Sequence, residues 1–177
     1  MIIKVTAKAK TTTGILTLNG ESHACALGHS GIVSAATKQE ADGATPAGTW
    51  PLRRLLYRAD KMSRPVTGLP TSAIKKEDGW CDAPDDVGYN AQIELPYGAS
   101  AEPLWRDDDL YNLIVVLGHN DDPVIAGKGS AIFFHVAKFK ADKLSPTEGC
   151  VALPQDILKT VLESCSTDTK MHIALET

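Results

Sequence analysis

The sequence predicts a mostly β domain with one or two short α-helices. Most apolar residues alternate with polar ones or form short β-branched runs, and only one clear stretch, near the C-terminus, has apolar residues at helical spacing. The 177 residues are enough for one domain with a substantial core, so we expect a single domain over residues 1–177. The contents of 43% hydrophobic and 23% charged residues are those of a globular protein rather than a disordered chain.

Strand patterns dominate the first third of the chain. Short segments bounded by turn residues predict strands at 2–7, 14–18, 23–28 and 31–34. The first two are expected to pair as a hairpin, and Asn19-Gly20, which favours a tight turn, follows them. Gly and Pro in residues 42–48 predict a loop. Residues 49–58 predict a further strand, in which Pro51 indicates an edge or a bulge.

The rest of the chain changes pattern twice. Residues 60–90 contain many turn residues and no clear periodicity, which predicts a long irregular excursion that is functional or mobile. Residues 109–118 and 129–135 give the strongest strand predictions, and we expect them at the centre of the core. Residues 154–163 have helical spacing with Pro154 in the first turn, and residues 171–175 predict a last strand.

Composition and charge exclude several classes of function. The formal net charge is -4, and no cluster of basic residues exceeds two neighbours, so we expect no nucleic-acid partner. No apolar run approaches the length of a membrane span, so we expect no membrane insertion. The four cysteines lack metal-ligand spacing, and we expect free thiols rather than disulfides. The sequence does not indicate an oligomeric state.

The start of the chain bears on the cellular compartment. Residues 1–8 alternate like a strand and lack a charged start followed by an apolar block, so they do not read as a secretory signal. We therefore expect a cytoplasmic protein if the chain is complete, and a periplasmic one if a leader has been removed.

A turn near residue 150 is the strongest functional signal. Residues 147–150 read Thr-Glu-Gly-Cys and precede an apolar segment, and His135 ends a predicted strand upstream. A cysteine that attacks a carbonyl needs a nearby base and inward-pointing backbone N–H groups. If the two strands are neighbours, Cys150 and His135 open onto one cleft, and the turn at Gly149 presents N–H groups to an oxyanion. In this hypothesis His135 holds Cys150 as a thiolate or takes its proton.

The same residues also fit a purely structural interpretation. In that interpretation Cys150 is a buried core thiol, and His135 is a strand-end histidine with a satisfied hydrogen bond. The residue types alone do not decide between the two interpretations.

Taken together, these motifs resemble the catalytic domain of the L,D-transpeptidases, the YkuD-type family. The resemblance rests on Ile132-Phe133-Phe134-His135, on Thr147-Glu148-Gly149-Cys150 after a spacer, and on Thr45-Pro46-Ala47-Gly48, which is similar to an upstream Thr-Pro-x-Gly loop. It extends from about residue 2 to residue 175. The resemblance implies a β-sandwich or barrel and a catalytic cysteine that forms a thioester without a metal or cofactor. It also implies a peptidoglycan stem peptide or muropeptide as the partner.

Two positions depart from the family pattern. Glu148 stands where the motif usually has a second histidine, and Val136 stands where a glycine commonly follows the catalytic histidine. A carboxylate beside the nucleophile works against thiolate formation unless it points away or pairs with a cation. The resemblance implies catalytic roles for Cys150, His135 and Gly149, and substrate contacts for Thr147 and Glu148.

Further residues are candidates for contact with the substrate. His119 lies in a polar loop and is expected to touch the substrate or Cys150, with a solvated loop histidine as the alternative. Trp80 and Arg106 lie in the irregular region that could wall the cleft, where Arg106 pairs with a substrate carboxylate or forms an exposed salt bridge. The charged residues before the Thr-Pro loop could meet the charged ends of a stem peptide or form a surface turn; they are Lys38, Glu40 and Asp42.

A metal site is not predicted. His119, His135 and Cys150 lack an evident fourth ligand for zinc, so we expect chemistry without a metal or cofactor.

The resemblance implies acyl transfer in which Cys150 attacks the carbonyl between the L-configured centre of a diamino acid and D-alanine. Water on the thioester then makes the enzyme an L,D-carboxypeptidase, whereas an amine from a second stem makes it a cross-linking L,D-transpeptidase. Because the chain opens directly into a strand, we expect the carboxypeptidase, acting in muropeptide recycling. A non-catalytic muropeptide-binding domain on the same fold is the third hypothesis.

Overall fold

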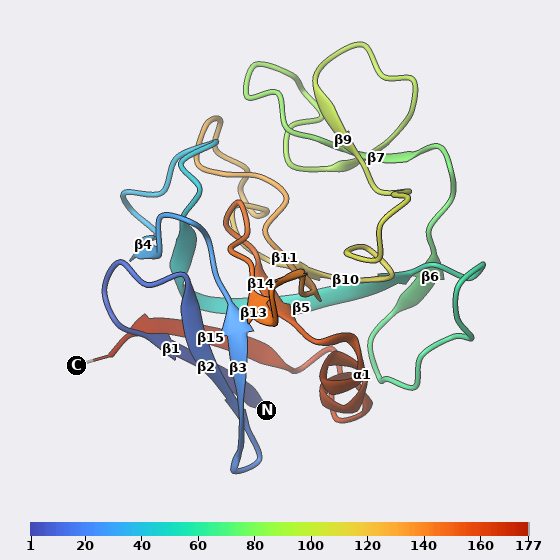
Figure 1. Ribbon diagram of the computed structural model, residues 1–177. Helices are drawn as coiled ribbons and strands as arrows, with labels where there is room; N and C mark the ends of the chain where they lie inside the picture. The colour runs from blue at the N-terminus through green and yellow to red at the C-terminus, as the bar shows by residue number, and fades with distance from the viewer. Residues whose placement is uncertain (177) are drawn as a thin grey trace.

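Ten strands form one large sheet that closes on itself as a barrel (Figure 1). A computed structural model describes residues 1–176. The strands of the large sheet are β1 (Ile2–Ala7), β2 (Thr13–Leu18), β3 (Glu21–Ala26), β4 (Ile32–Ser34), β5 (Thr45–Tyr57), β6 (Thr71–Ala73), β10 (Leu113–Leu117), β11 (Phe133–Val136), β14 (Val151–Leu153) and β15 (Lys170–Leu175). The order β10-β11-β14-β3-β2-β1-β15-β5 returns to its start because β5 also pairs with β10.

Strand β5 closes the barrel because its 13 residues reach both neighbours. Its first half pairs with β15, and its second half pairs with β10. The register with β10 shifts between Val116, which is opposite Arg54, and Leu117, which is opposite Leu52. Arg53 is therefore the extra residue of a β-bulge, which lies two residues after Pro51 and agrees with the predicted irregularity.

The interior of the barrel is packed with apolar side chains from alternating strand positions. In β1, Ile3 and Val5 are buried while Lys4 between them is exposed. The helix α1 (Gln155–Glu163) packs against the same core through one face, which carries Leu158, Val161 and Leu162. All four cysteines are buried and free, as predicted.

The prediction of a mostly β fold with a barrel-like sheet is confirmed, and the chain from 1 to 176 contains one α-helix. Two details of the prediction are wrong. The loop predicted over 42–48 ends earlier, since β5 begins at Thr45 and pairs there with Ile32 of β4. The excursion predicted over 60–90 is not wholly irregular, because it contains β6 and β7 (Asp78–Cys81). Such strands of three or four residues are too short to show periodicity.

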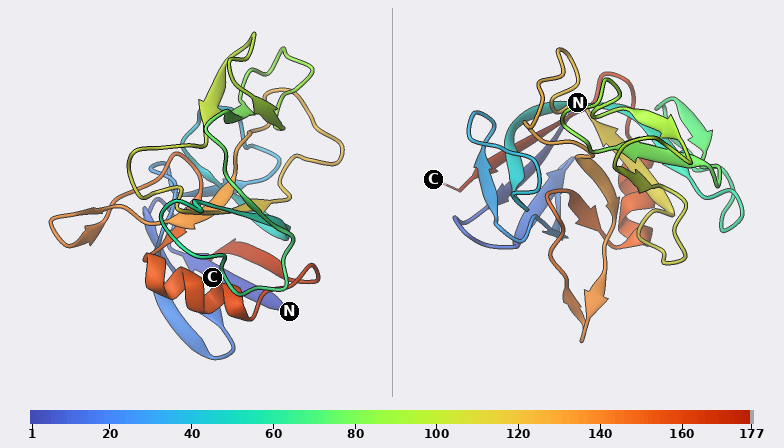
Figure 2. Two further views of the ribbon diagram at one scale, coloured as in Figure 1. Left: turned by 90° about the vertical axis from the view of Figure 1, so that its right-hand side faces the viewer. Right: turned by 90° about the horizontal axis from the view of Figure 1, so that it is seen from above.

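Strand β7 of the excursion joins two later strands in a small sheet outside the barrel, which we call the outer sheet. It consists of β7, β8 (Gln92–Glu94) and β9 (Ala101–Pro103), and it lies above β10 in the view of Figure 1. A second small hairpin, β12 (Phe139–Lys140) and β13 (Lys143–Leu144), projects from the body of the molecule in both views of Figure 2. In the described part of the chain, no helix is long and apolar enough to span a membrane.

Candidate active site

Cys150 and His135 come from neighbouring parallel elements of the barrel. Strands β11 and β14 pair in parallel with His135 opposite Ala152. Side chains alternate between the two faces of a strand, so Cys150, two residues before Ala152, lies on the same face of the sheet as His135. Both side chains line one pocket of about 490 Å³. The structure therefore brings the thiol and the imidazole to a single cleft.

The thiol of Cys150 is held by the backbone of the segment that leads into β11. Its Sγ accepts a hydrogen bond from the Phe133 N–H at 3.3 Å and donates one to the Ala131 carbonyl oxygen at 3.2 Å. Burial raises the pKa of the Cys150 thiol to about 12. The thiol is therefore protonated at neutral pH, and it needs a base at the moment of attack.

The ring of His135 is oriented by its own strand. Its Nδ1 lies 2.9 Å from the Val136 carbonyl oxygen, which can only accept, so Nδ1 carries the ring proton and Nε2 is the basic nitrogen. The ring of Tyr111 packs edge-on against the imidazole, with the two centroids 5.5 Å apart. Burial lowers the pKa of His135 to about 4, so the imidazole is neutral at neutral pH and can accept a proton.

Thr147 and Gly149 shape the turn that carries the nucleophile. The Thr147 hydroxyl donates to the Cys150 carbonyl oxygen at 2.7 Å and accepts from the Gly149 N–H at 3.2 Å. Gly149 has a φ of 138°, and a Cβ at this position would lie 2.9 Å from the Ala44 carbonyl oxygen. Only glycine fits there without strain. Thr147 also lines the pocket, but the hydrogen bonds of its hydroxyl hold the turn itself.

Glu148 turns toward the loop after β3. Its Oε2 lies 3.1 Å from Nε2 of His29, and its side chain is 91% exposed. The backbone of the same loop pairs with the nucleophile turn, since the His29 N–H donates to the Thr147 carbonyl at 2.8 Å and the Thr147 N–H donates to the Leu27 carbonyl at 2.9 Å. Glu148 raises the pKa of Cys150 less than Glu102 does. The carboxylate beside the nucleophile thus faces a histidine and solvent.

The far wall of the pocket carries buried charged groups. Glu102 accepts a hydrogen bond from the Tyr111 hydroxyl, and burial raises the pKa of Glu102. Lys38 is almost completely buried and forms an ion pair with Asp42. Lys38 and Glu40 both line the pocket, so the structure puts these two charged residues within reach of a bound peptide.

Arg106 also lines the pocket, and an internal pair already engages it. Its Nε and Nη2 donate to the two carboxylate oxygens of Asp108 at 2.9 and 2.7 Å. Its guanidinium carbon lies 5.1 Å from the centre of the Tyr111 ring. The structure thus shows the salt bridge that was one of the two predictions for Arg106, and pairing with a substrate carboxylate stays a prediction.

Trp80 and Asn90 support the site from behind. Trp80 is buried and lies outside the lining of the Cys150 pocket. The Oδ1 atom of Asn90 accepts hydrogen bonds from Trp80 Nε1 and from the Ala131 N–H, each at 3.0 Å. Since the Ala131 carbonyl holds the Cys150 thiol, this chain of hydrogen bonds ties the outer sheet to the nucleophile.

His119 lies apart from the reacting groups. It is buried, its Nε2 is 3.0 Å from the Lys128 carbonyl oxygen, and its ring packs edge-on against Trp50 at 4.8 Å. It does not line the Cys150 pocket. Burial lowers the pKa of His119. Among residues 1–176, no three His, Cys, Asp or Glu side chains are placed to hold a metal ion.

Two residues of the pocket were missed by the sequence reasoning, Tyr111 and Glu102. Tyr111 contacts His135, and Glu102 is the buried carboxylate paired with the tyrosine hydroxyl. Both lie in segments whose pattern indicates only strand or loop, and the contact between them depends on how the outer sheet folds back on β10. No local signal in the sequence marks this contact.

The family of this domain follows from comparison with known families. The model of the L,D-transpeptidase catalytic domain, YkuD, matches residues 4–173. The chain belongs to this family. Searches of the curated proteins and of the solved structures gave no match.

Membership of the L,D-transpeptidase family supports an activity on peptidoglycan stem peptides by a cysteine peptidase or acyltransferase. The geometry agrees with this chemistry, since the L,D-transpeptidase domain presents one thiol and one neutral imidazole on the same face of the sheet.

Proposed function

We propose that this L,D-transpeptidase-family domain is an L,D-carboxypeptidase that removes the terminal D-alanine from a tetrapeptide stem. The observation that carries the proposal is the placement of Cys150 and His135 on one face and in one pocket. The high pKa of the thiol and the low pKa of the imidazole make both groups neutral in the free enzyme. Such a pair transfers a proton during the attack rather than before it.

In the first step His135 takes the thiol proton while Sγ of Cys150 bonds to the carbonyl carbon of the diamino acid. The tetrahedral intermediate then collapses, the C–N bond breaks, and the amine of D-alanine leaves with the proton from His135. The Gly149 N–H already bonds to Thr147, so we assign the developing oxyanion to the N–H of Cys150.

In the second step water hydrolyses the thioester. His135 takes a proton from the water molecule, the resulting hydroxide adds to the thioester carbonyl, and the C–S bond breaks. The sulfur regains its proton from His135, and the tripeptide leaves with a free carboxylate. The cycle uses one water molecule and leaves the enzyme unchanged.

Two features support hydrolysis rather than cross-linking. Cys150 opens onto a pocket of about 490 Å³, a volume that suits one short peptide, and it does not line the larger cavity beside it. The four cysteines are free, which fits a reducing compartment. We therefore assign the proposed reaction to the cytoplasm, where it would trim recycled muropeptides.

The test is product analysis by mass spectrometry with a tetrapeptide muropeptide, with and without an acceptor stem peptide. We expect the wild type to release D-alanine, and Cys150→Ala to lower the rate by at least about 10⁴-fold. Cys165→Ala is the matched control, because Cys165 is also a buried thiol whose pKa burial raises, to about 11, but it lies after α1 and outside the pocket.

Three outcomes would contradict the proposal in different ways. Release of D-alanine by Cys150→Ala would rule out the cysteine mechanism. A cross-linked dimer formed by the wild type would identify a transpeptidase. Binding of the muropeptide without any turnover would identify a binding domain.

A further inference from the structure

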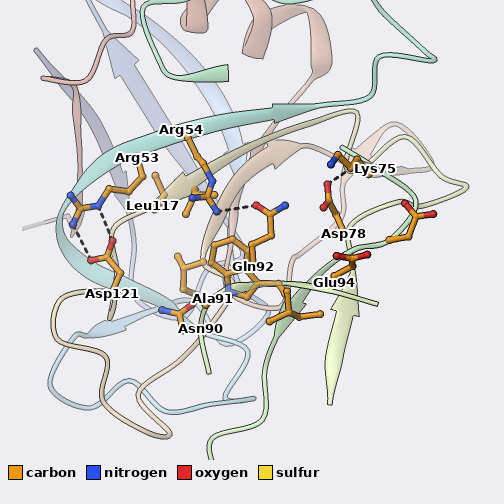
Figure 3. Close-up of a pocket in the computed structure, with 15 residues that line it drawn as sticks. Arg53, Arg54, Lys75, Asp78, Asn90, Ala91, Gln92, Glu94, Leu117 and Asp121 are labelled. Carbon is orange, nitrogen blue, oxygen red and sulfur yellow. Dashed lines mark hydrogen bonds and ion pairs between the residues drawn. The ribbon is translucent and has the colours of Figure 1, made fainter. Parts of the chain in front are cut away.

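A second cavity lies between β5 and the outer sheet (Figure 3). Its volume is about 850 Å³, compared with about 490 Å³ for the pocket of Cys150. Its walls come from β5, β7, β8 and β10, and Ile132 is shared with the pocket of Cys150. Neither Cys150 nor His135 lines it, so the second cavity is separate from the reacting groups.

The guanidinium of Arg54 lines this cavity and forms few hydrogen bonds with the protein. Its Nη2 donates to Oε1 of Gln92 at 3.0 Å, and its guanidinium carbon lies 5.7 Å from the centre of the Trp80 ring. Its Nε is buried and has no hydrogen-bond partner among residues 1–176. Only one nitrogen of the Arg54 guanidinium, Nη2, is therefore engaged by a protein acceptor in the described chain, although the side chain lines the cavity.

The preceding residue, Arg53, lines the same cavity but has a carboxylate partner in the protein. Its Nε and Nη2 donate to the two carboxylate oxygens of Asp121 at 2.7 and 3.0 Å (Figure 3). This bidentate pair satisfies the guanidinium with one protein carboxylate. Of the two adjacent arginines, Arg53 is thus paired with a carboxylate of the protein, whereas Arg54 forms no ion pair among residues 1–176.

Acidic side chains line another part of the cavity. Asp78 and Glu94 lie there with Lys75, away from the Arg53–Asp121 pair (Figure 3), and Glu77 completes this part of the lining. In the described part of the chain, neither Glu77 nor Glu94 forms an ion pair. The remaining lining includes buried apolar side chains, among them Val116, Leu117 and Ile132.

We propose that the second cavity binds a short zwitterionic peptide, with a carboxylate of the peptide on Arg54 and an ammonium group facing Glu94. A guanidinium binds a carboxylate through two parallel N–H···O bonds, and Arg54 lines the cavity with only its Nη2 engaged by the protein. The carboxylates at the other end repel a phosphate dianion and attract an ammonium group. The apolar lining accommodates the aliphatic part, and the volume lies within the range of peptide-sized pockets.

The site binds and does not react, since a ligand held there is not in contact with Cys150. The class of ligand follows from the lining alone and does not depend on the proposed carboxypeptidase activity. The choice of probe does rest on that activity, because a stem tripeptide with free carboxylates and a free ammonium group is the product of the proposed reaction.

The experiment is calorimetric titration of the stem tripeptide into the full chain carrying Cys150→Ala, which removes any turnover. We expect two binding events, one in each cavity. Adding Arg54→Gln should weaken one of them by at least about tenfold and leave the other unchanged. The matched control is Arg64→Gln, which removes the same group from an exposed arginine outside both cavities and should weaken neither event.

A second variant, Glu94→Gln, tests the same site if Arg54→Gln does not fold. Glu94 is exposed and forms no ion pair in the described chain, so Glu94→Gln should fold normally and weaken the same event about threefold. Equal titrations for Arg54→Gln, Glu94→Gln and Arg64→Gln would overturn the second site. In that case, release of D-alanine by the wild type would still support the proposed carboxypeptidase.

The same experiments also detect the case in which the carboxypeptidase proposal fails and the second site does not. If the wild type releases no D-alanine but one binding event depends on Arg54, the second site stands and the proposed carboxypeptidase fails. A cross-linked product whose yield depends on Arg54 would overturn the assignment of this cavity as non-reacting.

Discussion

The catalytic pocket and the second cavity meet at Ile132, yet they hold their polar groups in opposite ways. In the pocket, the Cys150 thiol bonds to the Phe133 N–H and the Ala131 carbonyl, and the His135 Nδ1–H bonds to the Val136 carbonyl. In the second cavity, the Arg54 guanidinium has one protein partner and a buried Nε without one in residues 1–176.

This difference separates a site built for chemistry from a site built for recognition. Reacting groups must stay in a fixed geometry, and backbone hydrogen bonds from the barrel strands provide it. A recognition site must leave donors available, and one wall of the second cavity is the outer sheet rather than the barrel. We therefore expect changes at His135 and at the turn of Gly149 to alter activity or stability, and changes at Arg54 and Glu94 to alter the affinity of the second cavity alone.

The largest expected effect is at His135 in the catalytic pocket, where the free energy of unfolding should depend on pH. The pKa of His135 is lowered to about 4 in the fold, from an ordinary value of 6.5. Below pH 6.5 the unfolded chain binds a proton at this histidine that the folded chain does not bind, so the free energy of unfolding falls as the pH drops from 6.5 toward 4. The loss approaches about 3 kcal/mol at the low end, and this contribution is constant above about pH 7.

Urea denaturation of the wild type and of His135→Gln at several pH values between 4.5 and 7.5 measures this loss. The variant should lose that part of the pH dependence, and the difference between the two curves isolates His135 from His119, whose pKa burial also lowers. His23→Gln is the control, because this half-buried histidine lies on β3 outside the pocket. Parallel curves for the wild type and His135→Gln would show that His135 is not held neutral by the fold.

A smaller effect is expected at the turn that carries the nucleophile. Gly149→Ala puts a Cβ 2.9 Å from the Ala44 carbonyl oxygen at a φ of 138°, which should lower the free energy of unfolding by about 2 kcal/mol. It should also lower kcat, since Cys150 follows directly, and leave the affinity of the second cavity unchanged. Urea denaturation and D-alanine release check the two effects.

Gly98→Ala is the matched control for this change. A Cβ at Gly98 meets nothing within 4 Å, so its stability should stay within about 0.5 kcal/mol of the wild type. If Gly149→Ala and Gly98→Ala have the same free energy of unfolding, the turn at Gly149 is not rigid, and the fixed geometry of the catalytic pocket does not depend on it.

The barrel could be predicted from the sequence because its strands carry strong local signals. The strands predicted at residues 109–118 and 129–135 are found as β10 and β11, each of which begins four residues later than predicted, and the helix predicted at 154–163 is α1. The pair of Cys150 and His135 could also be proposed, since neighbouring strands align their side chains by register. The second cavity could not, because Arg54 and Glu94 line one cavity only when the outer sheet folds over β5, and no local pattern encodes that arrangement.

The smallest expected effect concerns Glu148, which lies in the nucleophile turn two residues before Cys150. Its contact with His29, which is an ion pair only when His29 is protonated, is exposed, with side-chain exposures of 91% for Glu148 and 49% for His29, so it contributes less than about 1 kcal/mol. Glu148→Gln should therefore change both the free energy of unfolding and the rate of D-alanine release only slightly, by less than about threefold for the rate. Backbone hydrogen bonds from the Thr147 N–H to the Leu27 carbonyl and from the His29 N–H to the Thr147 carbonyl hold the turn without this pair. A rate lowered a hundredfold with unchanged stability would instead make Glu148 part of the reacting machinery, and the pocket would then include a third reacting group.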